Sequence, residues 1–177
     1  MLNHKVLKHH DISKEEFENL VGQFKVVDSH KELKKFLIED AYSRADAKES
    51  DGLLFVKSQE AISGYLYYSR KCLTDTTFYA ELMTYFEEDR SSDELQIEQE
   101  VFAYEVEYLC VDFYMQKKGI GTALMTYFLE NIFKKDDQSV FVELTAIKSA
   151  VKFYEKFNFS TDFEQPDASM TYMLRSD

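Results

Sequence analysis

The chain has 177 residues, 45% hydrophobic and 15% aromatic, which is enough apolar material for one domain with one core. Its 33 acidic and 21 basic side chains give a net charge of −12, which argues against a binder of nucleic acid or anionic membranes because phosphate groups would be repelled. No window approaches the roughly 18 apolar residues of a membrane span, and the first residues lack the apolar core of a signal peptide. We therefore expect a cytoplasmic protein, and two isolated cysteines fit a reducing compartment.

The first third of the chain predicts two helices and one strand. Ser13 followed by Glu16 has the spacing of a capping box before a short helix over 13–21. The apolar run FKVV at 24–27 predicts a strand. A second helix begins at Ser29, because apolar residues then recur at helical spacing.

The middle of the chain predicts a hairpin followed by a strand–helix–strand unit. Residues 52–58 and 62–72 are rich in β-formers and are separated by a short turn. A long strand follows over 101–113, then an amphipathic helix over 119–135 and an apolar strand over 139–145.

The end of the chain predicts one more helix over 148–157, stopped by Asn158, which tolerates the left-handed conformation. Strands over 159–163 and 170–176 complete the pattern. We predict an α/β fold: a mixed, mostly antiparallel central sheet of about six or seven strands with flanking helices, in a single domain over 1–177.

Three histidines near the start, His4, His9 and His10, raise the question of a metal site. No carboxylate or cysteine stands at metal-ligand spacing beside them on a clear helical face. We interpret them as part of a solvated terminus and expect no metal.

The strongest chemical signal is a glycine-containing loop between a predicted strand and a predicted helix. Its seven residues are Gln116, Lys117, Lys118, Gly119, Ile120, Gly121 and Thr122. Glycines permit a tight turn that exposes several backbone N–H groups at a helix N-terminus, which is a site for anions. The simpler interpretation is a turn that only joins two elements. The loop is neither a P-loop nor a dinucleotide-binding fingerprint, because the required lysine and third glycine are absent.

Two segments carry a family resemblance. VEYLCVDFYMQKKGIGTALM resembles motif A of the GNAT N-acetyltransferase superfamily, and AVKFYEKFNF at 150–159 resembles the second motif of that superfamily, in the right order. FLIEDAYSRA and ISGYLYYSRK are similar to the N-terminal helix and hairpin of its bacterial branch. The resemblance covers roughly residues 24–175.

The resemblance implies acetyl-CoA as co-substrate. In the family, the pyrophosphate rests on the amides of the loop, here Gln116 through Thr122. The pantetheine arm pairs with the preceding strand, here Leu109, Cys110 and Val111, next to a bulge that splays the sheet. Cys110 itself is expected to be a small buried apolar residue, since direct transfer needs no acetyl-cysteine intermediate. The family often has Asn at the position of Ile147, so that contact is lost here.

The resemblance also implies the acid–base groups. Glu105 stands eleven residues before Gln116, where one branch places its glutamate base, and Glu107 lies on the same face of the strand. We favour Glu105 over Glu107, and water alone is the alternative to both. Tyr154 matches the tyrosine that the family places beside the coenzyme sulfur.

An acidic insertion around 73–99 bears on the acceptor. Between Asp75 and Glu107 there are eleven acids, and Arg90 is the only base. As a rim of the acceptor site this segment would attract a cationic amine; the simpler interpretation is a solvated loop.

We therefore expect direct acetyl transfer in a ternary complex to a primary amine of a small, cationic molecule or peptide, without nucleic acid or membrane. The alternatives are a tRNA-acetylating, toxin-like GNAT and a non-catalytic acyl-CoA-binding module. The 27 Tyr and Phe side chains would allow a homodimer.

Overall fold

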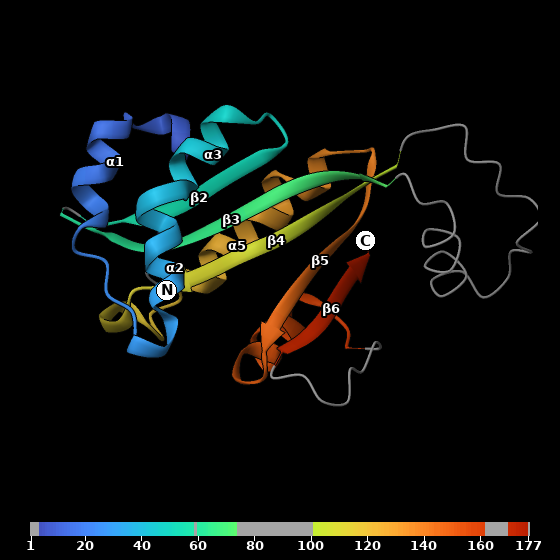
Figure 1. Ribbon diagram of the computed structural model, residues 1–177. Coiled ribbons are helices and arrows are strands. Elements are labelled where there is room, and N and C mark those ends of the chain that lie inside the picture. The colour runs from blue at the N-terminus through green and yellow to red at the C-terminus, as the bar shows by residue number, and fades with distance from the viewer. Residues whose placement is uncertain (1–3, 59, 74–100, 162–169, 177) are drawn as a thin grey trace, which may run out of the picture.

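The computed structural model describes residues 4–58, 60–73, 101–161 and 170–176. They form a six-stranded sheet with the strands in sequence order (Figure 1). The strands are β1 (Val6–Lys8), β2 (Asp51–Lys57), β3 (Ile62–Leu73), β4 (Val101–Val111), β5 (Ser139–Ile147) and β6 (Met170–Ser176). Of the five pairs of neighbours, β4 and β5 are parallel and the other four are antiparallel, so the predicted mixed α/β sheet is confirmed.

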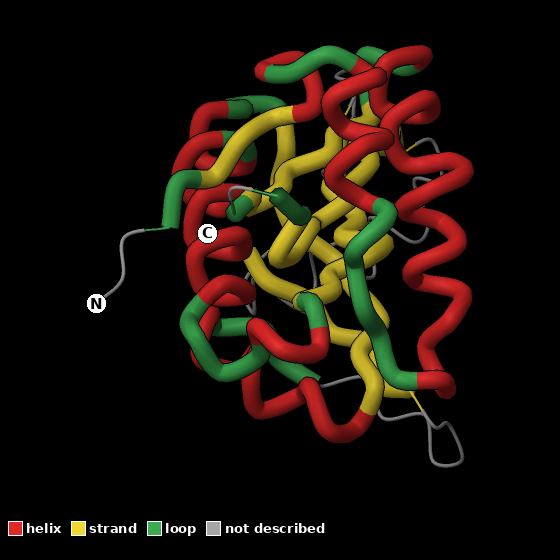
Figure 2. The backbone as a smooth tube through the Cα atoms, turned by 90° about the vertical axis from the view of Figure 1, so that its left-hand side faces the viewer, coloured by secondary structure: helices red, strands yellow, loops and turns green. Residues whose placement is uncertain are grey.

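Helices cover both faces of this sheet (Figure 2). Helices α1 (Lys14–Val21), α2 (Lys31–Phe36) and α3 (Tyr42–Ala47) lie on one face, and α5 (Ile120–Asn131) and α6 (Val151–Tyr154) lie on the other. The core on the α1–α3 face is rich in aromatic side chains, such as Phe17, Phe24, Phe36, Tyr65 and Tyr67. The core on the other face is built around the buried side of α5, with Leu124, Met125 and Phe128.

The N-terminal helices begin and end close to where the sequence predicts. The Ser13 hydroxyl accepts a hydrogen bond from the Glu16 amide at 3.1 Å and caps α1. The Glu16 carboxylate forms an ion pair with Lys57 Nζ on β2 at 2.6 Å, which connects α1 to the sheet. The second helical run continues from Asp28 to Ala47 through a π-helical turn at Leu37–Ala41.

The predicted strand at 24–27 is wrong. The segment is extended but lies outside the sheet, because its central residue bonds to the chain just beyond β4. The Lys25 amide donates to Asp112 Oδ2 at 2.7 Å, and the Lys25 carbonyl accepts from the Phe113 amide at 2.8 Å. The edge of the sheet is instead formed by β1, a strand of three residues that the sequence pattern did not indicate.

The C-terminal predictions are confirmed in part. The helix expected over 148–157 is a succession of three short turns, of which Val151–Tyr154 is α-helical, and Asn158 ends it with a φ of 62°. In the strand expected over 159–163, Ser160 forms an isolated bridge with Leu174, and residues from 162 onward lie outside the described part of the chain. The acidic insertion expected around 73–99 also lies outside the described residues, apart from Leu73.

Gly64 on β3 packs against the first turn of α5, and a substitution at this position tests the packing of the helix on the sheet. A Cβ at this position would stand 2.7 Å from Ile120 Cγ2 and 3.2 Å from the Cys110 carbonyl oxygen. We expect Gly64→Ala to lower the free energy of unfolding by about 1–3 kcal/mol through overpacking, measured by urea denaturation. Gly22→Ala is the matched control, because its helical backbone has no heavy atom within 4 Å of a new Cβ. Equal urea midpoints for Gly64→Ala and the wild type would contradict this packing.

Candidate active site

The sheet opens into a wedge between β4 and β5. The two strands pair from Phe102 to Val106 of β4 and no further, whereas β4 continues to pair with β3 as far as Val111. The separation begins at a β-bulge: Tyr67 faces Tyr108 and Tyr68 faces Val106, so that Glu107 is the extra residue. Figure 1 shows β5 turning away from β4 beyond this point. The bulge that the family resemblance implied is therefore present.

Backbone groups of β4 face this wedge. The Asp112 amide donates to the Ser63 carbonyl on β3 at 2.9 Å. Because the direction of N–H groups alternates along a strand, Cys110 also points to β3, and Leu109 and Val111 point to the wedge. Of the three residues that the sequence analysis assigned to the coenzyme arm, Leu109 and Val111 thus have backbone N–H and C=O groups that β5 does not use. The corresponding groups of Cys110 face β3.

The glycine-containing loop lies at the end of β4, between a 3₁₀ turn at Phe113–Met115 and α5. Two of its residues are left-handed, Lys117 with a φ of 60° and Gly119 with a φ of 83°. The first backbone bond into the helix runs from the Ala123 amide to the Gly119 carbonyl at 2.9 Å. The amides of Ile120, Gly121 and Thr122 therefore have no acceptor within the helix and can bind an anion.

The two glycines of the loop have different roles. Gly119 takes the left-handed conformation, whereas Gly121 lies within the helix. A Cβ at position 121 would lie 3.4 Å from the Phe153 ring of the 148–157 segment and 3.6 Å from Val111 Cγ2. These are ordinary van der Waals distances, so α5, β4 and the second motif meet at position 121 and a methyl group there would still fit.

Tyr154 lies on α6 and is buried beside the wedge. Its ring makes edge contacts with Phe153 and Phe159, at centroid distances of 5.1 and 6.0 Å. Burial, and to a lesser degree the charge of a Cys110 thiolate, raises the pKa of Tyr154 to about 12. Tyr154 belongs to the buried cluster against which Leu109 and Val111 of β4 also pack.

Glu105 lies in the closed part of the sheet, in register with Glu143 on β5 and Ser69 on β3. Lys71 on β3 forms ion pairs with both glutamates, the closer one with Glu105. Burial alone would lower the pKa of Lys71, but the two carboxylates raise it. The sequence analysis missed Lys71 and Glu143, although antiparallel pairing of the strands over 62–72 and 101–113 could have brought Lys71 near Glu105.

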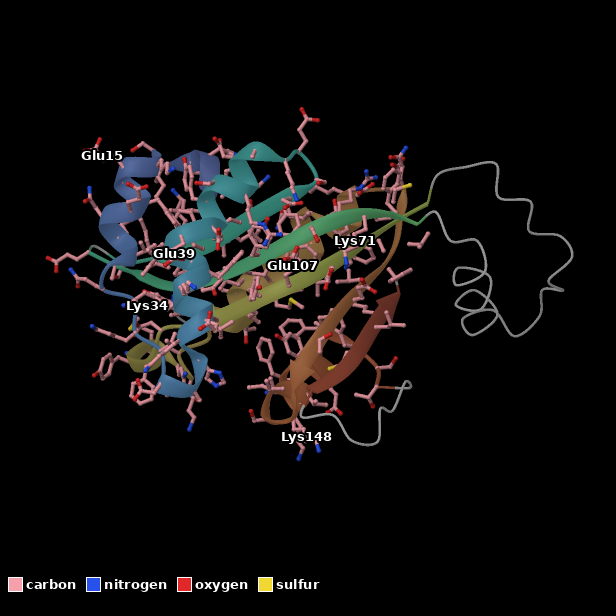
Figure 3. The ribbon with its side chains drawn as sticks, in the orientation of Figure 1. Glu15, Lys34, Glu39, Lys71, Glu107 and Lys148 are labelled. Atoms are coloured by element: carbon pink, nitrogen blue, oxygen red, sulfur yellow. The ribbon has the colours of Figure 1, made fainter. Side chains whose placement is uncertain are left out.

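Glu107 lies at the bulge, on the same side of the sheet as Lys71 (Figure 3). It contacts Arg44 of α3, whose NH2 group is 3.5 Å from Glu107 Oε2. The Arg44 guanidinium lies over the rings of Phe36 and Tyr67, at 5.5 and 5.2 Å. No local signal in the sequence indicates this arginine, because α3 and β4 are brought together by the fold.

Comparison with models of known protein families places the chain in a class. A model of the family described as "Acetyltransferase (GNAT) domain" matches residues 79–169. The chain belongs to this family of acetyl-CoA-dependent acetyltransferases. Comparison with curated proteins gives no match.

Solved structures with this fold include several bacterial toxins, at sequence identities that show the fold alone. A protein described as a bacterial toxin matches with a TM-score of 0.67 at 19% identity, over 98% of this chain and 92% of the other. AtaTR bound with AcCoA matches with a TM-score of 0.67 at 12% identity, over 97% and 94%. AtaT complexed with acetyl-methionyl-tRNAfMet matches with a TM-score of 0.65 at 10% identity, over 96% and 94%.

Two further findings concern other kinds of site. In the described part of the chain, no group of three or more His, Cys, Asp or Glu side chains is placed to hold a metal ion. None of the helices among these residues has the length and hydropathy that a membrane crossing requires.

Cys110 and Cys72 should differ in reactivity. Burial, together with the charge of Asp112, raises the pKa of Cys110 to about 12, so about one thiol in ten thousand is ionised at pH 8. Cys72 is exposed on β3. We expect iodoacetamide at pH 8 to label Cys72 and leave Cys110 unmodified, as measured by peptide mass spectrometry. Cys72→Ser should abolish labelling of the native protein, and unfolding in urea should restore it at Cys110. Equal labelling rates of the two thiols in the native protein would contradict the assigned burial.

Proposed function

We propose that this acetyltransferase moves the acetyl group of acetyl-CoA to a primary amine by direct transfer in a ternary complex. The observation that carries the proposal is the wedge between β4 and β5, which has the glycine-containing loop at its end. The exposed amides of Ile120, Gly121 and Thr122 suit a diphosphate, and the exposed Lys117 and Lys118 add positive charge. The amide groups of Leu109 and Val111 suit a pantetheine arm lying along β4, with the thioester carbonyl accepting from the Leu109 N–H.

The proton of the acceptor has to leave before or during the transfer. An amine with a pKa near 10.4 is neutral in about one molecule in 2,500 at pH 7, which costs roughly 4.6 kcal/mol. Glu107 and Glu105 are both candidates for the base. Two observations support Glu107, contrary to the preference from the sequence: it stands at the bulge where the wedge opens, and its contact with Arg44 is long at 3.5 Å. Glu105 lies where β4 and β5 are still paired, and its carboxylate is engaged in a close ion pair with Lys71.

Tyr154 serves the leaving group. When the amine nitrogen bonds to the acetyl carbon, the carbon–sulfur bond breaks and the coenzyme leaves as a thiolate. A phenol with a pKa of about 12 is a weaker acid than a thiol with a pKa near 8.5, so proton transfer from Tyr154 to this thiolate is uphill by about 5 kcal/mol. We therefore assign Tyr154 a hydrogen bond to the thiolate, which stabilises the charge without full proton transfer.

The charge distribution bears on the acceptor. Segment 74–100 contributes nine acids and one arginine, segment 162–169 contributes three acids, and Asp177 one more, which together account for all twelve net negative charges. The described residues hold 20 basic and 20 acidic side chains. The body of the enzyme is therefore neutral, and the argument from net charge against an RNA acceptor applies to these segments alone.

Two acceptor classes follow. Three carboxylates on β4 and β5, those of Glu105, Glu107 and Glu143, support a small cationic amine as the first candidate. The neutral body and the fold shared with AtaT, which has been seen with acetyl-methionyl-tRNAfMet, support the amino group of an aminoacyl-tRNA as the second. The expectation from the sequence that the protein does not bind nucleic acid therefore stays a prediction. A binding module without catalysis is the third candidate, in which Tyr154 would serve only as a buried core residue.

Substitution of the acid–base residues tests the mechanism. We expect Glu107→Gln to lower kcat/KM by about 10²–10⁴ through loss of the general base, and Glu105→Gln to lower it less than tenfold.

Tyr154→Phe should lower kcat by about 10- to 100-fold with an unchanged Kd for coenzyme A, since the hydrogen bond forms only as the thiolate develops. Release of coenzyme A and calorimetry are the measurements.

Glu130→Gln is the control, because this exposed glutamate near the C-terminal end of α5 pairs with Lys134 in the turn after the helix, away from the wedge. A larger loss for Glu105→Gln than for Glu107→Gln would assign the base to Glu105. Full activity of both variants would assign proton removal to water.

The acceptor classes are separated by competition between amines and RNA. We expect turnover with polyamines and lysine-rich peptides to fall as salt rises from 50 to 500 mM, because the acidic segments then attract the acceptor less. The measurement is release of coenzyme A across an amine panel, with aminoacyl-tRNA as a parallel substrate. Turnover with aminoacyl-tRNA and none with the panel would overturn the small-amine candidate, and turnover insensitive to salt would overturn electrostatic steering.

A further inference from the structure

His4, at the start of the described chain, contacts the glycine-containing loop 114 residues away. Its Nε2 atom lies 2.7 Å from the carbonyl oxygen of Lys118. A carbonyl oxygen only accepts hydrogen bonds, so the imidazole is the donor. The contact exists because β1 pairs with β2 and so brings residue 4 to the beginning of α5. Beside this contact lies a groove of about 720 Å³, whose lining includes His4, Lys118 and Thr122.

The Lys118 carbonyl belongs to the peptide that joins Lys118 to Gly119. Lys118 itself lies between two left-handed residues, Lys117 and Gly119, of which Lys117 carries a side chain that disfavours this conformation. The described chain has no cis peptide bonds. In a trans peptide the C=O and the next N–H point in opposite directions, so the bond from His4 directs the Gly119 N–H away from the imidazole.

We propose that His4 is a positioning residue of the diphosphate site. By holding the Lys118 carbonyl, it fixes the peptide between residues 118 and 119 so that the Gly119 N–H joins the helix amides that face the anion. Donation to the carbonyl also polarises the peptide, which strengthens its N–H as a donor. The inference rests on the proposed function, since it assumes that the loop binds the diphosphate of coenzyme A.

The role predicts a selective defect. His4→Phe keeps a ring of similar size and removes the donor, whereas His4→Gln keeps a donor. By calorimetry, we expect His4→Phe to raise the Kd for coenzyme A about three- to tenfold and His4→Gln to restore most of the affinity. For acetyl-pantetheine, which ends before the diphosphate, kcat/KM should be unchanged in both variants. With acetyl-CoA the loss should fall on KM and leave kcat at the wild-type value. His10→Phe is the matched control, because His10 is an exposed histidine on the turn after β1.

The outcomes separate the two proposals. A wild-type protein that binds no coenzyme A overturns the proposed function, and this inference with it. Wild-type affinity in His4→Phe, with normal binding by the native protein, overturns the role of His4 alone. Equal losses for acetyl-CoA and acetyl-pantetheine, or a lowered urea midpoint in His4→Phe, would make the histidine a structural residue and also overturn the inference.

Discussion

The separation of β4 from β5 is the constraint on which the site depends. Two parallel strands that stayed paired to their ends would use every amide of β4 for the sheet. One extra residue, Glu107, shifts the register against β3 and strengthens the local twist, and pairing with β5 stops one residue before it. The amides of Leu109 and Val111 are thereby left to a ligand, while β3 keeps the other edge of β4 in the sheet.

The same opening brings the two family motifs together. Helix α5 starts at the end of β4, and the segment that carries Tyr154 follows β5, so the two lie on the same face of the sheet. The Phe153 ring lies beside Gly121 in the first turn of α5. A substrate lying along β4 would therefore meet loop amides at one end and a buried phenol at its reactive part.

Charge in this protein is divided between the body and segments beyond the described residues. The body is neutral, and its charged side chains near the wedge are paired: Glu107 with Arg44, and Glu105 with Lys71. Such pairing of partly exposed charges adds little net stability. Attraction of a cationic acceptor would then come mainly from the acidic segments, and selection among acceptors from the wedge itself.

The sequence by itself determined those features that depend on neighbouring residues. Ser13 caps its helix, Asn158 ends the segment after β5, and the strand–loop–helix unit around Gly119 forms as predicted, because each follows from local backbone chemistry. The tertiary structure alone decided that residues 24–27 leave the sheet and that β1 joins it. The Lys25 amide donates to the Asp112 carboxylate and the Lys25 carbonyl accepts from the Phe113 amide, so these two bonds replace those that a neighbouring strand would have made.

The tertiary structure also decided the partners of Glu105, Glu107 and Lys118. Residues far apart in the chain meet only when the sheet, its bulge and its helices are assembled, and the spacing along a single sequence carries no record of these contacts.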